Sequence, residues 1–144
     1  MKYEFSTDIG RLDIPLIHQF LSEYSTWARG IPRGLVEKSI ENSLCFGLYD
    51  AGNQIGFARV VTDKATFAHL VDVFIVPEER GKGLSRRLVE YVLAHPDLQG
   101  LRRFTLTSST APWLYEKLGW TALHSPHIFM ERYDPHVYTK QENQ

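Results

Sequence analysis

The chain has 144 residues, of which 43% are hydrophobic and 23% are charged, a balance that fits one soluble globular domain over residues 1–144. Its formal net charge of −1 excludes a general attraction to nucleic acid or to an anionic membrane surface. No apolar run approaches membrane-spanning length and the first residues do not resemble a signal peptide, so a cytoplasmic protein is expected.

Cysteine and histidine usage excludes two further classes of site. Cys45 is the only cysteine, so no internal disulfide can form, and its apolar surroundings favour a packing role over a nucleophilic one. The six histidines are scattered, and His124 and His127 flank a turn without a second pair of ligands. We therefore expect no metal.

The first part of the chain predicts a strand and two helices. Residues 2–5 have the composition of a strand, and Asp13 can cap a helix that extends to Tyr24. A second helix is expected over 34–42. The loop between the helices is bounded by glycine and proline and contains three side chains suited to binding: Trp27, Arg29 and Arg33.

The middle of the chain predicts antiparallel strands joined by tight turns. Residues 44–49 and 55–62 form a hairpin, and the turn 63–66 leads into a strand over 67–76. Pro77 ends this strand because it has no N–H to donate. After a polar turn with two glycines, apolar residues recur four apart from Leu84, which indicates a helix.

The last third predicts one parallel strand and a closing hairpin. A right-handed crossover would place the strand 101–107 parallel to 67–76, and a short helix follows over 112–118. Residues 120–123 and 128–133 are expected to pair, and exposed aromatic residues there could support a homodimer. The polar segment 134–144 is expected to be a flexible tail. The fold class is therefore α/β, a mixed sheet with helices on both faces.

The strand–glycine turn–helix unit has the geometry of an anion site. The first N–H groups of a helix lack internal partners and lie at the positive end of its dipole. Basic residues at this end suggest a polyanionic ligand, although a solvated basic loop beside glutamates remains an alternative. The spacing matches neither a Walker loop nor a dinucleotide-binding fingerprint. The basic residues of the unit are Arg80, Lys82, Arg86 and Arg87.

Two segments together resemble the GNAT superfamily of acyl-CoA-dependent N-acetyltransferases. Arg80-x-x-Gly83-x-Ser85, preceded by Val-Pro-Glu, resembles its motif A, with serine at the last small position. The segment 114–120, LYEKLGW, is similar to a second motif of the family and follows at the usual distance. The resemblance covers nearly the whole chain, and the N-terminal and middle stretches are similar to those of small bacterial members of the family. It implies a GNAT fold.

The resemblance also implies the ligands and the binding residues. Acetyl-CoA would be the cosubstrate and an amine the acceptor, with the pyrophosphate on the loop amides and the pantetheine along the strand before the loop. This requires strands 67–76 and 101–107 to splay apart. The residues implied in cofactor binding are Phe74, Ile75, Val76, Arg80, Gly81, Lys82, Gly83, Leu84, Ser85, Arg86 and Ser108.

Two residues are candidates for catalysis. Tyr115 matches the family tyrosine that protonates the departing thiolate, and its position in the motif favours this role over that of an amphipathic core residue. Asp72 lies within an apolar strand and could act as a base, bind the amine, or form a cross-strand ion pair with Arg59. Strand alternation places His69 on the opposite face from Asp72, and a water-relayed deprotonation is also open.

The loop 24–33 is the expected wall of the acceptor site. Trp27 could stack on a substrate or fold back onto the core, and Arg29 or Arg33 could bind a carboxylate. We expect an N-acetyltransferase that acts on a primary amine of a small molecule by direct transfer, or on a protein or peptide amine. The alternatives are a non-catalytic acyl-CoA sensor and a generic phosphate or nucleotide binder.

Overall fold

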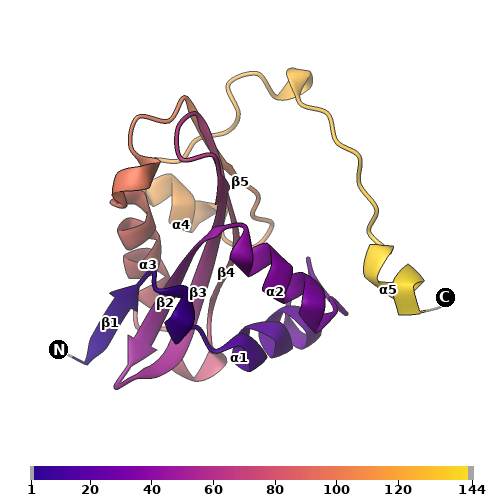
Figure 1. Ribbon diagram of the computed structural model, residues 1–144. Helices are drawn as coiled ribbons and strands as arrows, with labels where there is room; N and C mark the ends of the chain where they lie inside the picture. The colour runs from indigo at the N-terminus through magenta and orange to yellow at the C-terminus, as the bar shows by residue number, and fades with distance from the viewer. Residues whose placement is uncertain (1, 143–144) are drawn as a thin grey trace.

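The computed structural model describes residues 2–142 and has a five-stranded sheet at its centre (Figure 1). The strand order is β1-β2-β3-β4-β5, antiparallel from β1 to β4, with β4 and β5 parallel. This confirms the expected mixed sheet. The strands are β1 (Tyr3–Ser6), β2 (Leu44–Asp50), β3 (Asn53–Thr62), β4 (Phe67–Ile75) and β5 (Arg103–Leu106).

Helices cover both faces of the sheet. One face carries α1 (Ile14–Gln19) and α2 (Arg33–Glu41), and Asp13 caps α1 by accepting a hydrogen bond from the Leu16 N–H at 3.1 Å. A π-helical turn, Phe20–Tyr24, extends α1. The other face carries α3 (Leu84–Leu93), which the periodicity predicted, and α4 (Pro112–Lys117), which lies within the short helix expected over 112–118.

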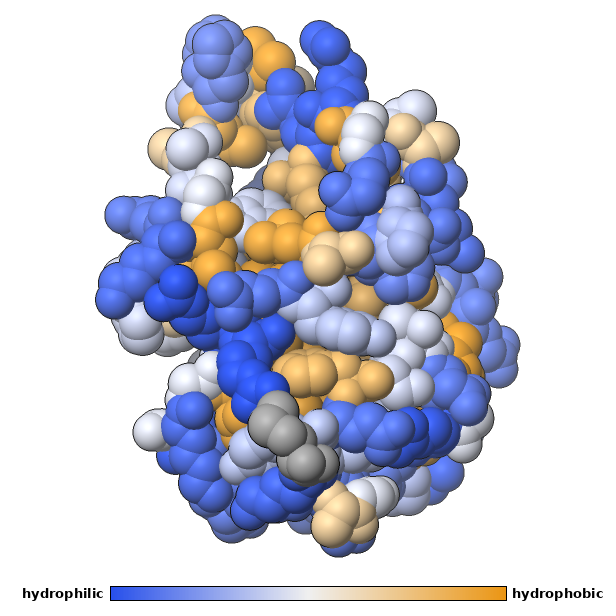
Figure 2. Space-filling model, turned by 90° about the vertical axis from the view of Figure 1, so that its left-hand side faces the viewer, coloured by the Kyte–Doolittle hydropathy of each residue, from blue (hydrophilic) through white to orange (hydrophobic). Residues whose placement is uncertain are grey.

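The apolar face of α3 forms the centre of the larger core cluster. Its four inward side chains, Leu84, Leu88, Val89 and Val92, are at most 2% exposed. Each such burial contributes about 1.5–3 kcal/mol, so packing of this face holds the helix against the sheet. Viewed from this side, the surface shows apolar residues as separate patches between hydrophilic ones (Figure 2).

The smaller core cluster lies under α1 and α2 and contains Cys45. This residue is 2% exposed, and burial raises the pKa of its thiol to about 12. The thiol therefore keeps its proton at neutral pH, and the predicted packing role is confirmed.

The predicted closing hairpin is wrong. Neither 120–123 nor 128–133 forms a strand, and the only regular element between them is a 3₁₀ turn, Pro126–Ile128. We call residues 120–136 the C-terminal arm. It runs away from α4 and leads to α5 (Val137–Glu142), a helix within the segment expected to be a tail (Figure 1). Residues 143 and 144 of that predicted tail lie outside the described part of the chain.

No helix in the described part of the chain combines the length and the apolar character that crossing a membrane would require.

Candidate active site

The sheet opens between β4 and β5, as the resemblance implied. β5 pairs only with the first four residues of β4, Phe67–Leu70, so residues 71–75 have no strand partner on that side. On the other side the Val76 N–H donates to the Ile55 carbonyl at 2.8 Å. Because peptide groups alternate along a strand, the N–H of Ile75 faces the opening, whereas those of Phe74 and Val76 face β3.

The loop after β4 leaves a row of main-chain N–H groups at the start of α3. Gly83 is the N-cap of α3 with φ 74°, and Gly81 has φ 82°. Among the described residues, none accepts a hydrogen bond from the N–H groups of residues 84–86. A Cβ atom added at either glycine would meet nothing within 4 Å, so the space in front of the loop is open. Such a site suits an anion.

The basic side chains around the loop form only weak interactions with neighbouring groups. Arg80 Nε donates to the Ile75 carbonyl at 3.2 Å, and Lys82 Nζ lies 3.0 Å from a carboxylate oxygen of Glu79. Arg86 forms a 3.8 Å pair with Glu90. Exposed pairs of this kind are worth about 0–1 kcal/mol, so an incoming polyanion can compete for these cations.

Arg87, by contrast, is directed away from the loop. Its guanidinium lies 5.6 Å from the ring centroids of both Tyr3 and Phe5. The side chain therefore covers β1 and is not part of the candidate anion site.

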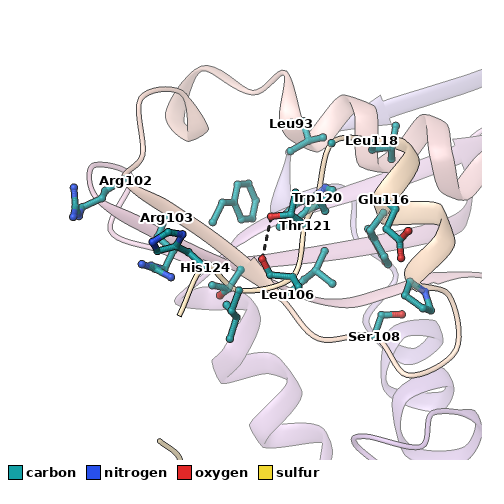
Figure 3. A pocket seen from close by; sticks show the side chains of 17 residues that line it. Leu93, Arg102, Arg103, Leu106, Ser108, Glu116, Leu118, Trp120, Thr121 and His124 are labelled. Carbon is teal, nitrogen blue, oxygen red and sulfur yellow. Dashed lines mark hydrogen bonds between the residues drawn. The ribbon is translucent and has the colours of Figure 1, made fainter. Parts of the chain in front are cut away.

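Tyr115 and Ser108 line a cavity of about 740 Å³ along the outer side of β5. In Figure 3 Ser108 and Glu116 lie at one end of this cavity, and Arg103 and His124 at the other. The Ser108 hydroxyl accepts a hydrogen bond from the Ala111 N–H at 3.1 Å and so shapes the turn before α4. No residue of the glycine loop lines this cavity, so the two predicted parts of the cofactor site are separate features here.

The Tyr115 side chain has the protonation state that an acid needs. Its ring is half-buried against the α3 core cluster, 6.2 Å from the ring of Trp120, and burial raises its pKa above the usual 10. Its hydroxyl makes no hydrogen bond to a described residue and is not fully buried. The phenol therefore carries a proton at neutral pH and is free to donate it.

Asp72 is buried and holds two partners. One carboxylate oxygen lies 2.9 Å from Arg59 Nε, and the other accepts a 2.7 Å hydrogen bond from Trp27 Nε1. Asp72 is 7% exposed. The expected ion pair with Arg59 is present, and a bond from the 25–33 loop joins it. With both oxygens engaged, this carboxylate connects the loop to the sheet.

A β-bulge places Asp72 in this position. Phe57 pairs with Phe74 and Arg59 with Val71, so Asp72 and Val73 together oppose the single residue between them on β3. Asp72 adopts φ 57°, a left-handed conformation that aspartate tolerates better than most residues.

Because of the bulge, the prediction that His69 lies on the opposite face from Asp72 is wrong. The bulge shifts the alternation by one residue, so His69 lies on the same face as Asp72 and not on the opposite one, and its Nδ1 lies 2.7 Å from Thr105 Oγ1. Burial, with a contribution from Arg59, lowers the pKa of His69, so the ring is neutral at pH 7. Nothing in the local sequence indicates the bulge, which is why this residue was missed.

The 25–33 loop is ordered by local hydrogen bonds and presents an aromatic surface. Ser25 Oγ donates to the Leu21 carbonyl at 2.6 Å and accepts from the Ala28 N–H at 3.0 Å. Trp27 remains 51% exposed although its indole N–H is bound to Asp72. Arg29 is exposed, and Arg33 is exposed and forms a 3.7 Å pair with Glu37. The loop thus presents the exposed indole ring of Trp27, which the hydrogen bond from its N–H to Asp72 holds in place.

Among the described residues there is no group of three or more aspartate, glutamate, histidine or cysteine side chains that could hold a metal ion.

An open β4–β5 pair followed by free amides at a helix N-terminus defines the class of acyl-CoA-dependent acyltransferases with the GNAT fold. Residues 41–122 match the family model described as "Acetyltransferase (GNAT) domain", and the chain belongs to this family. The Gibberella zeae protein FG08082, which is named as an acetyltransferase, is 31% identical to this chain. The alignment covers 80% of this chain and 76% of the Gibberella zeae protein.

Solved structures agree with this assignment. A GNAT-family protein from Xanthomonas campestris pv. campestris is 52% identical, with a TM-score of 0.93 over 95% of this chain and 96% of its own. Glucosamine-6-phosphate N-acetyltransferase from Arabidopsis thaliana has a TM-score of 0.64 at 19% identity, over 92% of this chain and 99% of its own, and shares the fold alone. The chain is an acetyltransferase, and its family uses acetyl-CoA as cosubstrate.

Proposed function

We propose that this protein transfers the acetyl group of acetyl-CoA to a primary amine of a small molecule, directly and within a ternary complex. The observation that carries the proposal is the open edge of β4 leading to unpartnered N–H groups at the start of α3. An extended, polyanionic cosubstrate needs both features in this order.

The loop would hold the diphosphate of the cosubstrate. The N–H groups of residues 84–86 point into open space beside Gly81 and Gly83, and Arg80 and Lys82 add positive charge. The Ser85 hydroxyl can supply a further donor. The pantetheine would then lie along residues 71–75, where the N–H of Ile75 can stabilise the oxyanion that forms on the acetyl carbonyl.

Tyr115 would act as the acid. A half-buried, protonated phenol can give its proton to the departing thiolate, and it then recovers one from solvent. The lone pair of a neutral amine attacks the thioester carbonyl, the carbon–sulfur bond breaks, and the amide forms without an acyl-enzyme.

Asp72 would position the acceptor wall, since both of its oxygens are already engaged. The exposed ring of Trp27 would form the apolar part of that wall, and Arg29 and Arg33 its cationic rim. The amine would lose its proton to water or to neutral His69, which lies on the same face as Asp72.

A comparison of native protein with Tyr115→Phe tests the proposal. We expect native protein to release thiol from acetyl-CoA only when a primary amine from a panel of amino acids, polyamines and aminoglycosides is present. Tyr115→Phe should keep coenzyme A binding and lower kcat by roughly 10²-fold or more. Coenzyme A binding without turnover of any amine or peptide would instead establish the non-catalytic sensor.

A further inference from the structure

Part of the sheet face that α1 and α2 cover remains open to solvent. The residues of the smaller core cluster, such as Cys45, Phe57 and Phe74, lie under these two helices. Farther along the sheet, the ends of β3 and β4 that meet at their common turn rise beyond α2 (Figure 1). Two large apolar side chains there are well exposed, Val61 at 44% and Phe67 at 41%.

Strand register places these side chains on the same face as His69. Val61 pairs with His69, and Phe67 precedes His69 by two residues on β4. Thr105 of β5 also pairs with His69, and the 2.7 Å contact between their side chains lies on this face. Val71, which is half-buried, follows His69 in the same alternation. We call Val61, Phe67, His69, Val71 and Thr105 the open sheet face.

The open sheet face leads directly to the candidate active site. Val71 is the first residue of β4 without a partner on β5, so the opening of the sheet begins at this residue. The next residue, Asp72, holds the exposed ring of Trp27 through a 2.7 Å hydrogen bond. An amine that reaches an acetyl group beside residues 71–75 would therefore lie between the ring of Trp27 and the open sheet face.

The charges around this face disfavour a second cation on the acceptor. Within β3, β4 and β5 Asp72 is the only acidic residue, and its two oxygens are engaged by Arg59 and Trp27. His69 is neutral at pH 7, because burial lowers its pKa. Arg103 lies on the same face at the start of β5 and adds positive charge. A polyamine or an aminoglycoside would bring further ammonium groups to strands without a free carboxylate.

We propose that the open sheet face binds the part of the acceptor beyond its amine, and that the acceptor is a monoamine with an aromatic or branched apolar group. This inference rests on the proposed function, because it concerns the acceptor of that reaction. With the amine beside Asp72, the apolar group would cover Val71 and Val61 and contact the ring of Trp27. Val61 lies opposite His69, three residues along β4 from Asp72, a span of roughly 10 Å that a phenylalkyl amine can cover.

Acceptor selectivity of the native protein is the first test. At a fixed concentration of acetyl-CoA, kcat/KM for 2-phenylethylamine and 3-methylbutylamine should exceed that for methylamine, spermidine and kanamycin by about tenfold or more. Equal or higher kcat/KM for methylamine, spermidine or kanamycin would overturn the inference and leave the proposed function standing. If none of the five amines is acetylated, the inference fails, and if the amino acids of the wider panel fail as well, the proposed function fails with it.

A charge placed on the open sheet face gives an independent test. Val61→Glu should raise KM for 2-phenylethylamine by about fivefold or more and leave KM for acetyl-CoA native, because the carboxylate removes apolar contact at an exposed position. Val61→Thr keeps the β-branched shape and should raise the same KM by about twofold, which keeps the test decisive if Val61→Glu does not fold.

The matched control is Ile9→Glu, at a residue outside the site that is 46% exposed, and it should keep both KM values. Circular dichroism checks that each variant is folded. Native KM for 2-phenylethylamine in the folded Val61 variants would refute the inference. A native dimer that Val61→Glu dissociates in sedimentation would also refute it, because a second copy of the chain would then occupy the open sheet face.

Discussion

Asp72 joins three parts of the molecule through one carboxylate. It holds Arg59 of β3 at 2.9 Å and Trp27 of the acceptor loop at 2.7 Å, and it sits in the bulge of β4. A buried charge that loses its counter-charge is costly, whereas the loss of one hydrogen bond from a neutral donor costs less. The two contacts can therefore be separated by mutation.

Asp72→Asn should destabilise the protein by about 1–3 kcal/mol, because it leaves Arg59 without a counter-charge while asparagine still tolerates φ 57°. Trp27→Phe removes only the bond from the loop and should cost less. Both variants should raise KM for the amine more than KM for acetyl-CoA. Urea unfolding and steady-state kinetics measure these effects. A loss confined to kcat, with an altered acid limb of the pH profile in Asp72→Asn alone, would identify Asp72 as a base instead.

At the scale of elements, the turn between β3 and β4 depends on one acidic side chain. Asp63 accepts hydrogen bonds from the Thr66 hydroxyl at 2.6 Å and from the N–H groups of Ala65, Thr66 and Phe67. The Thr66 side chain contributes most to lowering the pKa of Asp63, and the N–H groups add to it. These bonds favour the charged carboxylate.

The pKa of Asp63 is lower in the folded state than in the unfolded state, where it is near 3.8. The stabilisation by the charged carboxylate is therefore complete above the unfolded-state pKa and disappears as the pH falls through the folded-state pKa. The difference in unfolding temperature between native protein and Asp63→Asn should therefore be constant above about pH 5 and narrow below it. Thermal unfolding followed by circular dichroism checks this. A difference that stays constant into strong acid would show that the charge of Asp63 does not support the turn.

At the scale of the whole molecule, the sequence predicts those elements that depend on local patterns. Neighbouring residues alone determine three of these elements: the helix α3 through its periodicity, the end of β4 through the proline after it, and the glycine loop. The bulge at Asp72 depends on how β4 matches β3, and the run VDVFIV carries no mark of it. The prediction of a closing hairpin failed for a related reason, since strand composition in 128–133 does not specify a partner strand, and the segment forms no strand.

The same distinction applies to the candidate site. Motif residues located the glycine loop with its free N–H groups, and the ion pair of Asp72 with Arg59 followed from strand pairing. The bond from Trp27 to Asp72 spans 45 residues and could not be read from either segment. The cavity beside Tyr115 depends on the course of the arm, which no local pattern specifies.

The central claim is that the N–H groups at the start of α3 bind coenzyme A, and two glycines allow a matched test. Gly83 and Gly100 both have φ 74°, and a Cβ atom at either would meet nothing within 4 Å. Alanine at each therefore adds similar backbone strain, about 1–2 kcal/mol, but only Gly83 lies at the loop.

Calorimetric titration with coenzyme A compares the native protein, Gly83→Ala and Gly100→Ala. We predict similar losses of thermal stability in both variants, native affinity in Gly100→Ala, and at least about tenfold weaker binding in Gly83→Ala, equivalent to roughly 1.4 kcal/mol. Native affinity in Gly83→Ala, or no binding to the native protein, would contradict the account.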